Sequence, residues 1–231
     1  MNIYEIKSKL ERQEKAVFSI NEISRLIGKP KNIAAVYANR MQKKGLLFRI
    51  EKNRLSVSDD IFIVASQLGF PSYLGLSTAL YLNNVLPQII DRIYIISPKQ
   101  KRQMMIFDTD IIFIKFKPDM MFGYKKIRKG NSFVFVSDLE KTIIDILISR
   151  RYFNLGSVIQ ALKKADTEKL ACYLTLLKKE HLNRRVGYLL DSLGIKHSII
   201  RKTKTIYRLN PLRKEKGKFN NKWFLYINER I

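Results

Sequence analysis

The chain has 231 residues and carries 44 Lys and Arg against 20 Asp and Glu, a formal net charge of +24. A hydrophobic fraction of 46% excludes disorder as a description of the whole chain, and the commonest partner of such a positive charge is nucleic acid. No apolar run reaches the ~18 residues that a membrane span needs, and no apolar signal core opens the chain. We therefore expect a cytoplasmic protein without a membrane partner.

Residues 1–58 predict two helices followed by a hairpin. Ser19 and Glu22 have the spacing of a capping box that opens a short helix. Gly28-Lys29-Pro30 ends that helix, and a second helix is expected over residues 31–44, ahead of a glycine. Two short apolar runs around a charged turn follow and indicate a hairpin. This order resembles the winged helix-turn-helix superfamily, so we expect a DNA-binding domain here.

The second helix of this domain is expected to enter the major groove, and the hairpin to lie along the phosphate backbone or in the minor groove. Asn39 and Arg40 would read base edges, because Asn pairs with adenine and Arg with guanine. Residues 1–59 carry thirteen Lys and Arg and six Asp and Glu, a surplus that favours DNA over an acidic protein partner. The expected phosphate contacts are Lys31, Lys43, Lys52 and Arg54. The full set of candidate DNA-binding residues is Lys31, Asn32, Ala35, Asn39, Arg40, Lys43, Arg49, Lys52, Asn53 and Arg54.

Residues 59–195 predict a mixed α/β domain, which makes the whole chain α+β. Apolar residues at helical spacing predict helices over 60–68, 76–82, 138–149, 155–164, 167–179 and 182–193. Runs rich in β-branched and aromatic residues predict strands over 92–97, 111–116 and 132–136. The single cysteine, Cys172, can form no internal disulfide. It lies in an apolar helix and is expected to be buried in the core of the protein.

Three stretches of this domain resemble a known family. They are Pro71–Tyr81 (PSYLGLSTALY), Val136–Leu147 (VSDLEKTIIDIL) and Arg184–Gly194 (RRVGYLLDSLG). After a winged helix, they are similar to the antitoxins of type IV abortive-infection (AbiE-type) toxin–antitoxin systems, over roughly residues 15–195. The resemblance implies a repressor that binds inverted repeats in its own promoter. It also implies a nucleotidyltransferase-like toxin that is countered without a stable complex, although the family includes stand-alone regulators.

The stretch around Asp138 is expected to be structural. Ser137 would cap the helix, with Glu140 completing a capping box, and Lys141 and Asp145 would pair on the surface. Asp138 and Asp145 would lie ~10 Å apart along the helix, which is too far to hold one metal ion. We expect neither a metal nor another cofactor.

An enzyme is the alternative from a different class. The carboxylates of Asp108 and Asp110 could hold metal ions in a nucleic-acid- or nucleotide-processing enzyme. That chemistry also needs a phosphate-binding Gly-Ser helix start upstream, and none precedes the pair at a suitable distance. No catalytic residue is therefore expected, and the pair fits a turn before a strand. A third interpretation is an interaction module that neutralises an acidic protein.

Residues 196–231 form a basic C-terminal extension, with eleven Lys and Arg and two acidic residues. The densest run is Arg213–Lys218, and aromatic residues follow it. Basic residues interleaved with aromatics suit a nucleic-acid backbone with base stacking. The equally supported alternative is a solvated loop before a final strand that packs Trp223 on the core. Strands are expected over residues 205–209 and 223–227.

Overall fold

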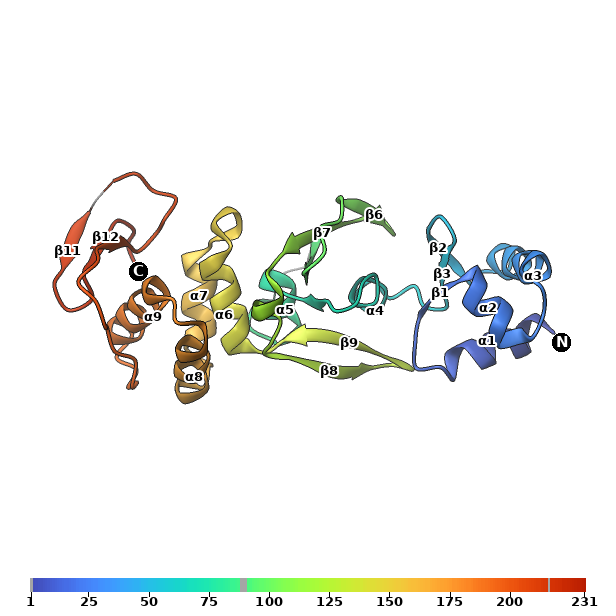
Figure 1. The fold of residues 1–231 in the computed structure, drawn as a ribbon, viewed down its shortest axis with the longest axis horizontal. Helices are drawn as coiled ribbons and strands as arrows, with labels where there is room; N and C mark the ends of the chain where they lie inside the picture. The colour runs from blue at the N-terminus through green and yellow to red at the C-terminus, as the bar shows by residue number, and fades with distance from the viewer. Residues whose placement is uncertain (1, 88–90, 216) are drawn as a thin grey trace. The chain divides into compact units, whose positions relative to one another are not determined.

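The structure is a computed structural model that describes residues 2–87, 91–215 and 217–231. Met1 of the expected first domain and Lys216 of the expected basic run lie outside these residues. The chain is α+β (Figure 1) and divides into two compact units. Unit 1 is drawn from Met1–Leu74 and Asp91–Val136, and unit 2 from Gly75–Ile90 and Ser137–Ile231. The expected boundaries near residues 58 and 195 do not coincide with this division.

Unit 1 begins with three helices and a small antiparallel sheet. The helices are α1 (Ile3–Glu11), α2 (Ile20–Ile27) and α3 (Lys31–Lys43). The strands β1 (Val17–Ser19), β2 (Phe48–Glu51) and β3 (Arg54–Ser56) pair in the order β1-β3-β2. The second helix, the third helix and the hairpin of β2 and β3 therefore follow one another in the predicted order.

The capping box predicted at the start of α2 is confirmed. The Ser19 hydroxyl accepts a hydrogen bond from the Glu22 backbone N–H, and the Glu22 carboxylate accepts one from the Ser19 N–H. Burial acts to raise the pKa of Glu22, but hydrogen bonds from Lys15 and Ser19 outweigh it and lower the pKa to about 2. At the other end, Gly28 adopts a left-handed φ of 63°, which a glycine tolerates without strain.

These first elements of unit 1 enclose one apolar core. It is formed by Ile6, Leu10, Phe18, Ile23, Ile27, Ala34, Ala38, Met41, Leu47 and Leu55. The contribution of α3 is narrow, since only Ala34, Ala38 and Met41 are buried along its thirteen residues. Their spacing of four and three residues places them on one side of the helix. The opposite side of α3 is therefore left exposed.

The rest of unit 1 is a six-stranded mixed sheet with the order β6-β7-β5-β4-β9-β8, against which α4 (Ile61–Ser66) packs. The strands are β4 (Tyr73–Leu74), β5 (Arg92–Ser97), β6 (Met104–Ile106), β7 (Thr109–Lys115), β8 (Tyr124–Lys129) and β9 (Ser132–Ser137), with a 3-10 turn at Pro118–Met120. The pairs β5–β7 and β4–β9 are parallel, and β6–β7 and β4–β5 are antiparallel. The predicted strands appear as β5, β7 and β9.

Unit 2 contains five helices and a small sheet among its described residues. The helices are α5 (Leu76–Leu82), α6 (Leu139–Ile148), α7 (Leu155–Leu162), α8 (Thr167–Leu177) and α9 (Glu180–Ser192), with a 3-10 turn at Arg150–Tyr152. Each helix lies within two residues of its predicted bounds. The strands β10 (Tyr207–Arg208), β11 (Lys218–Asn220) and β12 (Leu225–Ile227) pair in the order β10-β12-β11.

Helix α6 corrects two expectations. Its N-cap is Asp138, whose carboxylate accepts from the Lys141 N–H at 2.8 Å, whereas the Ser137 hydroxyl hydrogen-bonds to Thr142. Lys141 and Asp145 form the expected ion pair, but both side chains are completely buried instead of lying on the surface. The reason is packing, because α5, α7, α8 and α9 all contact α6 and cover it.

The C-terminal segment packs onto α9 and belongs to unit 2. The fully buried Arg184 donates hydrogen bonds to backbone carbonyls of Thr203 and Thr205 and pairs with Glu180 at 3.2 Å. A Cβ atom at Gly187 would lie 2.1 Å from the Trp223 ring, so this contact requires glycine. Trp223 is 2% exposed, which confirms the packing alternative for this side chain.

Cys172, in contrast, is exposed, and its expected place in the core is wrong. Its helix α8 buries only Leu170 and Leu174, which are four residues apart. Cys172 lies two residues from each of them and therefore faces the other side of the helix. The apolar composition of the stretch hid this asymmetry.

His181 makes the stability of the fold dependent on pH. Burial, aided by the nearby cations Arg185 and Lys179, lowers its pKa from 6.5 to about 4. The folded chain therefore binds this proton more weakly than the unfolded chain does, so acid favours unfolding. The contribution of His181 is complete above pH 6.5 and is lost as the pH falls from 6.5 towards 4.

Denaturant titrations at about pH 7.5 and about pH 5 check this prediction. We expect the free energy of unfolding of the native sequence to be lower at the acidic pH than at the higher pH. The difference should be smaller for His181→Gln, because glutamine does not titrate. An equal loss in both proteins would contradict the assignment to His181.

Candidate nucleic-acid interface

The side of α3 that faces away from the core carries a mixed stripe of polar and apolar side chains. Asn32, Val36, Asn39 and Lys43 are spaced by four, three and four residues and therefore form one line along the helix. All four are exposed, as is Arg40 beside them. The two residues expected to read bases, Asn39 and Arg40, thus have free access to solvent.

Two apolar residues of this face were missed by sequence reasoning. Val36, which is part of the stripe, is 49% exposed, and Ile33, which lies beside the stripe on the flank of Arg40, is 40% exposed. The sequence did contain a signal for their exposure, because neither residue fits the spacing of Ala34, Ala38 and Met41 that defines the buried side of the helix. The candidate residues on α3 included one apolar residue, Ala35, but neither of these two. In a major groove, an exposed apolar side chain can contact the methyl group of thymine.

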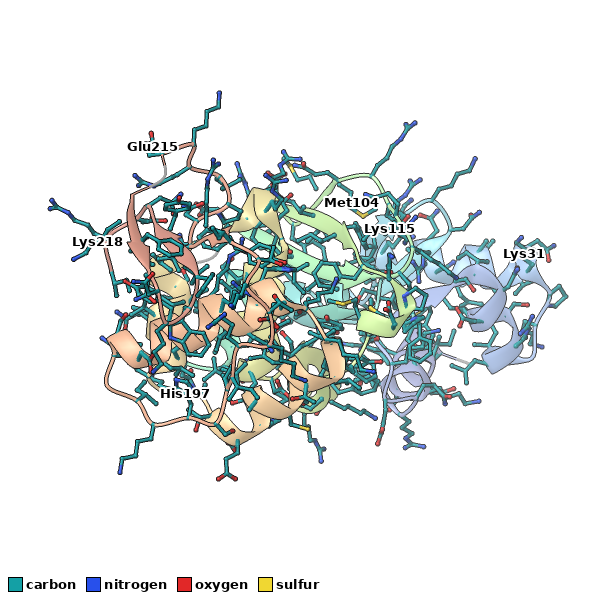
Figure 2. All side chains as sticks on the ribbon, turned by 60° about the vertical axis from the view of Figure 1, so that its left-hand side comes forward. Lys31, Met104, Lys115, His197, Glu215 and Lys218 are labelled. Carbon is teal, nitrogen blue, oxygen red and sulfur yellow. The ribbon has the colours of Figure 1, made fainter. Side chains whose placement is uncertain are left out.

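Positive charge is concentrated in α3 and the hairpin. From Lys29 to Arg54 there are eight basic residues and one acidic residue, Glu51, whereas residues 2–28 hold five basic and four acidic residues. The exposed cations of this segment form no ion pair within the part of the chain that the structure describes. They are Lys29, Lys31, Arg40, Lys43, Lys44, Arg49 and Lys52, and Figure 2 labels Lys31 at the start of α3. An unpaired, exposed cation is free to meet a phosphate.

The hairpin of β2 and β3 presents its turn to solvent. Lys52 and Asn53 form the turn, and both side chains are exposed. Asn53 has a φ of 62°, a left-handed conformation that asparagine tolerates better than most residues. Arg49 on β2 is also exposed. Asn53 therefore has a conformational reason for its place, in addition to its predicted role at an interface.

Arg54 differs from the other nine candidates, which are all exposed. Its guanidinium donates to the Leu68 carbonyl at 2.7 Å and to Glu51 at 3.2 Å. Lys101 donates to the same carbonyl at 2.9 Å. Arg54 thus ties the hairpin to the rest of unit 1, and the donors that it uses there are not available to a phosphate.

The two carboxylates of the enzyme alternative occupy a tight turn and the strand after it. Asp108 has a left-handed φ of 57° between β6 and β7, which agrees with a turn. Asp110 lies on β7 and pairs with Arg92 of the neighbouring strand at 3.7 Å. Among residues 2–87, 91–215 and 217–231, no group of three or more His, Cys, Asp or Glu side chains could hold a metal ion.

The family-like stretch at Asp138 lies in a charge network of unit 2. Lys169 pairs with Asp138 at 3.0 Å and with Glu140 at 3.1 Å, and the Tyr173 hydroxyl donates to Asp138 at 2.8 Å. Burial and the Asp138 carboxylate raise the pKa of Tyr173 to about 12, which keeps the hydroxyl protonated as a donor. These contacts join the start of α6 to α8, which is a structural role.

Comparison with known proteins adds a likeness of fold. No family model and no curated protein matches the chain. Among solved structures, it is similar to the crystal structure of the RV2827C protein from Mycobacterium tuberculosis, with a TM-score of 0.60 and 15% sequence identity. The match covers 96% of this chain and 89% of that chain. No helix in the described part of the chain is long and apolar enough to cross a membrane.

Proposed function

We propose that the chain is a sequence-specific DNA-binding transcriptional repressor whose first 58 residues form a winged helix-turn-helix. The observation that carries this proposal is the outward face of α3. It is exposed along its length, mixes amide, guanidinium and apolar side chains, and has unpaired cations at its edges. Attraction to the phosphate backbone requires only the cations, whereas recognition of a base sequence also requires the amide and apolar side chains.

The dimensions of α3 suit a groove. Thirteen residues at ~1.5 Å each give a helix of ~20 Å, and an α-helix fits the width of the major groove. In this arrangement Asn39 and Arg40 hydrogen-bond to base edges, and Ile33 and Val36 contact thymine methyl groups. Phosphate contacts then come from the exposed lysines and arginine of α3 and the hairpin, namely Lys31, Lys43, Arg49 and Lys52.

The biological role that we propose is that of an autoregulating antitoxin of a type IV toxin–antitoxin system. This part rests on the sequence resemblance at Pro71–Tyr81, Val136–Leu147 and Arg184–Gly194. The operator would be inverted repeats in the promoter of its own gene, and a nucleotidyltransferase-like toxin would be countered without a stable complex. A stand-alone regulator without a toxin is the alternative, and the same DNA-binding surface would serve it.

The proposal is tested by binding to the DNA upstream of the gene and to scrambled DNA of equal length, over a range of salt concentrations. Specific binding is expected to exceed non-specific binding by about 10³ or more. Each phosphate contact should contribute a slope of about −0.9 in a plot of log K against log salt. Equal affinity for both DNAs would mean that the positive charge only attracts phosphate groups and that no sequence is read. No binding at low salt would refute the proposal.

A further inference from the structure

The C-terminal part of unit 2 contains a pocket of about 800 Å³ between the end of α9 and the segment around Trp223. Its volume is within the range of ~300–1,000 Å³ that small-molecule sites occupy. We propose that this pocket binds a small organic phosphate, with the anionic group on Arg201 and Lys196 and the organic part against neighbouring isoleucines. The proposal is independent of the DNA-binding function, because it concerns other residues and another ligand.

Arg201 is held in place by contacts that leave its charge uncompensated. Its Nε donates to the Lys222 carbonyl at 3.0 Å, and Nη1 donates to the Thr203 carbonyl at 2.8 Å. The guanidinium carbon lies 4.1 Å from the centre of the Phe224 ring. Within the described residues no carboxylate lies at ion-pair distance from Arg201. A guanidinium has five N–H donors, so three remain for an anion on a side chain whose orientation is already fixed.

The one carboxylate of the pocket is already satisfied. Asp191 accepts from Lys222 Nζ at 2.7 Å, from the Trp223 indole N–H at 2.5 Å and from His197 Nε2 at 3.2 Å. Burial acts to raise the pKa of Asp191, but these donors, Lys222 first, lower it, so the group is ionised. Asp191 and Lys222 therefore cancel each other in charge.

His197 already has a partner for each ring nitrogen. Its Nδ1 accepts a hydrogen bond from the Ile199 N–H at 3.2 Å, and its Nε2 lies 3.2 Å from the Asp191 carboxylate. Figure 2 labels this side chain on the segment that follows α9. Lys196, which lines the pocket together with Arg201 and Lys222, is exposed and forms no ion pair in the part of the chain described. Two positive charges, Lys196 and Arg201, are thus left for a ligand.

The apolar side of the pocket indicates that the ligand is more than inorganic phosphate. Ile195 and Ile200 line it, and Ile200 is 64% exposed next to Arg201 in the sequence. A large exposed isoleucine beside two unpaired cations fits a ligand with an anionic end and a flat or apolar end. A nucleoside phosphate has both, and it is the probe that we choose.

Trp223 makes the test unusually selective, because it is the one tryptophan of the chain and it lines the pocket. The full-length protein is titrated with ADP, adenosine, inorganic phosphate and a short DNA duplex, with tryptophan fluorescence and calorimetry as readouts. We expect ADP to bind and to change the fluorescence, and adenosine and inorganic phosphate each to bind at least about tenfold more weakly, since each lacks one half of the ligand.

Arg201→Gln is expected to weaken ADP binding about tenfold or more, whereas Arg230→Gln, a matched change at an exposed arginine that does not line the pocket, leaves it unchanged. Circular dichroism verifies that the variants fold, and Lys196→Gln serves if Arg201→Gln does not. The proposal would be overturned if ADP gave no response, or if the pocket variant and the control variant bound ADP equally well. It would also be overturned if the DNA duplex were the one ligand that changed the fluorescence. Inorganic phosphate that binds as tightly as ADP would overturn the organic part of it.

Discussion

Replacing Asp145 by alanine is expected to lower the free energy of unfolding by about 3–5 kcal/mol. The Asp145 carboxylate and the Lys141 ammonium pair at 0% exposure beneath four helices. Removing the carboxylate takes this charged partner away from a buried ammonium, so the cost of desolvating that charge is offset less. Urea titrations of both proteins measure the difference, provided that the dependence on denaturant is the same in each.

The control for this prediction removes both charges. Lys141→Met combined with Asp145→Leu fills the same space with apolar groups, and such exchanges are often neutral or stabilising. We therefore expect the double variant to recover most of the stability that Asp145→Ala loses. If Asp145→Ala cost less than about 1 kcal/mol, or if the double variant were the less stable of the two, the buried pair would not have the importance that we assign to it.

The second large effect is expected at the outward face of α3. Arg40→Ala should weaken binding to the operator by about ten- to a hundredfold, which corresponds to ~1–3 kcal/mol. The reason is that a bidentate contact to guanine contributes to specific binding only. Affinity for scrambled DNA should fall far less, so the ratio of the two affinities, measured at one fixed salt concentration, is the decisive quantity.

A matched control is available in α1. Arg12 is exposed, lies at the C-cap of that helix and is outside the proposed interface. Arg12→Ala removes the same charge and should leave the ratio of specific to non-specific affinity unchanged. Should Arg40→Ala lower both affinities by the same factor, Arg40 would be a phosphate contact and base reading would have to come from Asn32 or Asn39.

Lys52 and Arg54, the two cations at the turn of the hairpin, are expected to differ in their effects. The sequence predicts a phosphate contact for both, but Arg54 donates hydrogen bonds to Leu68 and Glu51, whereas the Lys52 side chain is exposed at the turn. Both changes to alanine remove one charge, yet they act on different properties. Loss of Lys52 affects a candidate phosphate contact, whereas loss of Arg54 affects how the hairpin is held within unit 1.

The sequence by itself determined the elements whose signals are local. A capping box, a glycine after a helix or a run of apolar residues at helical spacing involves groups within a few residues of one another. For this reason the start of α2, the break at Gly28 and the five helices of unit 2 were predicted close to their observed bounds. The candidate residues on α3 also followed from spacing, since the buried side of a short helix fixes which residues point outward.

Other elements had no local signal to read. The strands β6 and β8 are the two edges of the six-stranded sheet, and β8 (YKKIRK) is mostly charged. Edge strands carry charge because one side of their backbone has no partner strand, so the apolar pattern of a strand is weak there. Each pairs with the strand that follows it in the chain, β6 with β7 and β8 with β9, and it is this pairing that makes them strands.

Only the tertiary structure decided which charged side chains are buried and where the aromatic side chains pack. Nothing near Lys141 or Asp145 in sequence states that four helices cover them, and nothing near Trp223 states that it packs against Gly187. The cluster of Lys196, Arg201 and Trp223 likewise exists only because the C-terminal segment folds back onto α9. Burial depends on the packing of distant segments, and a local pattern carries no information about that packing.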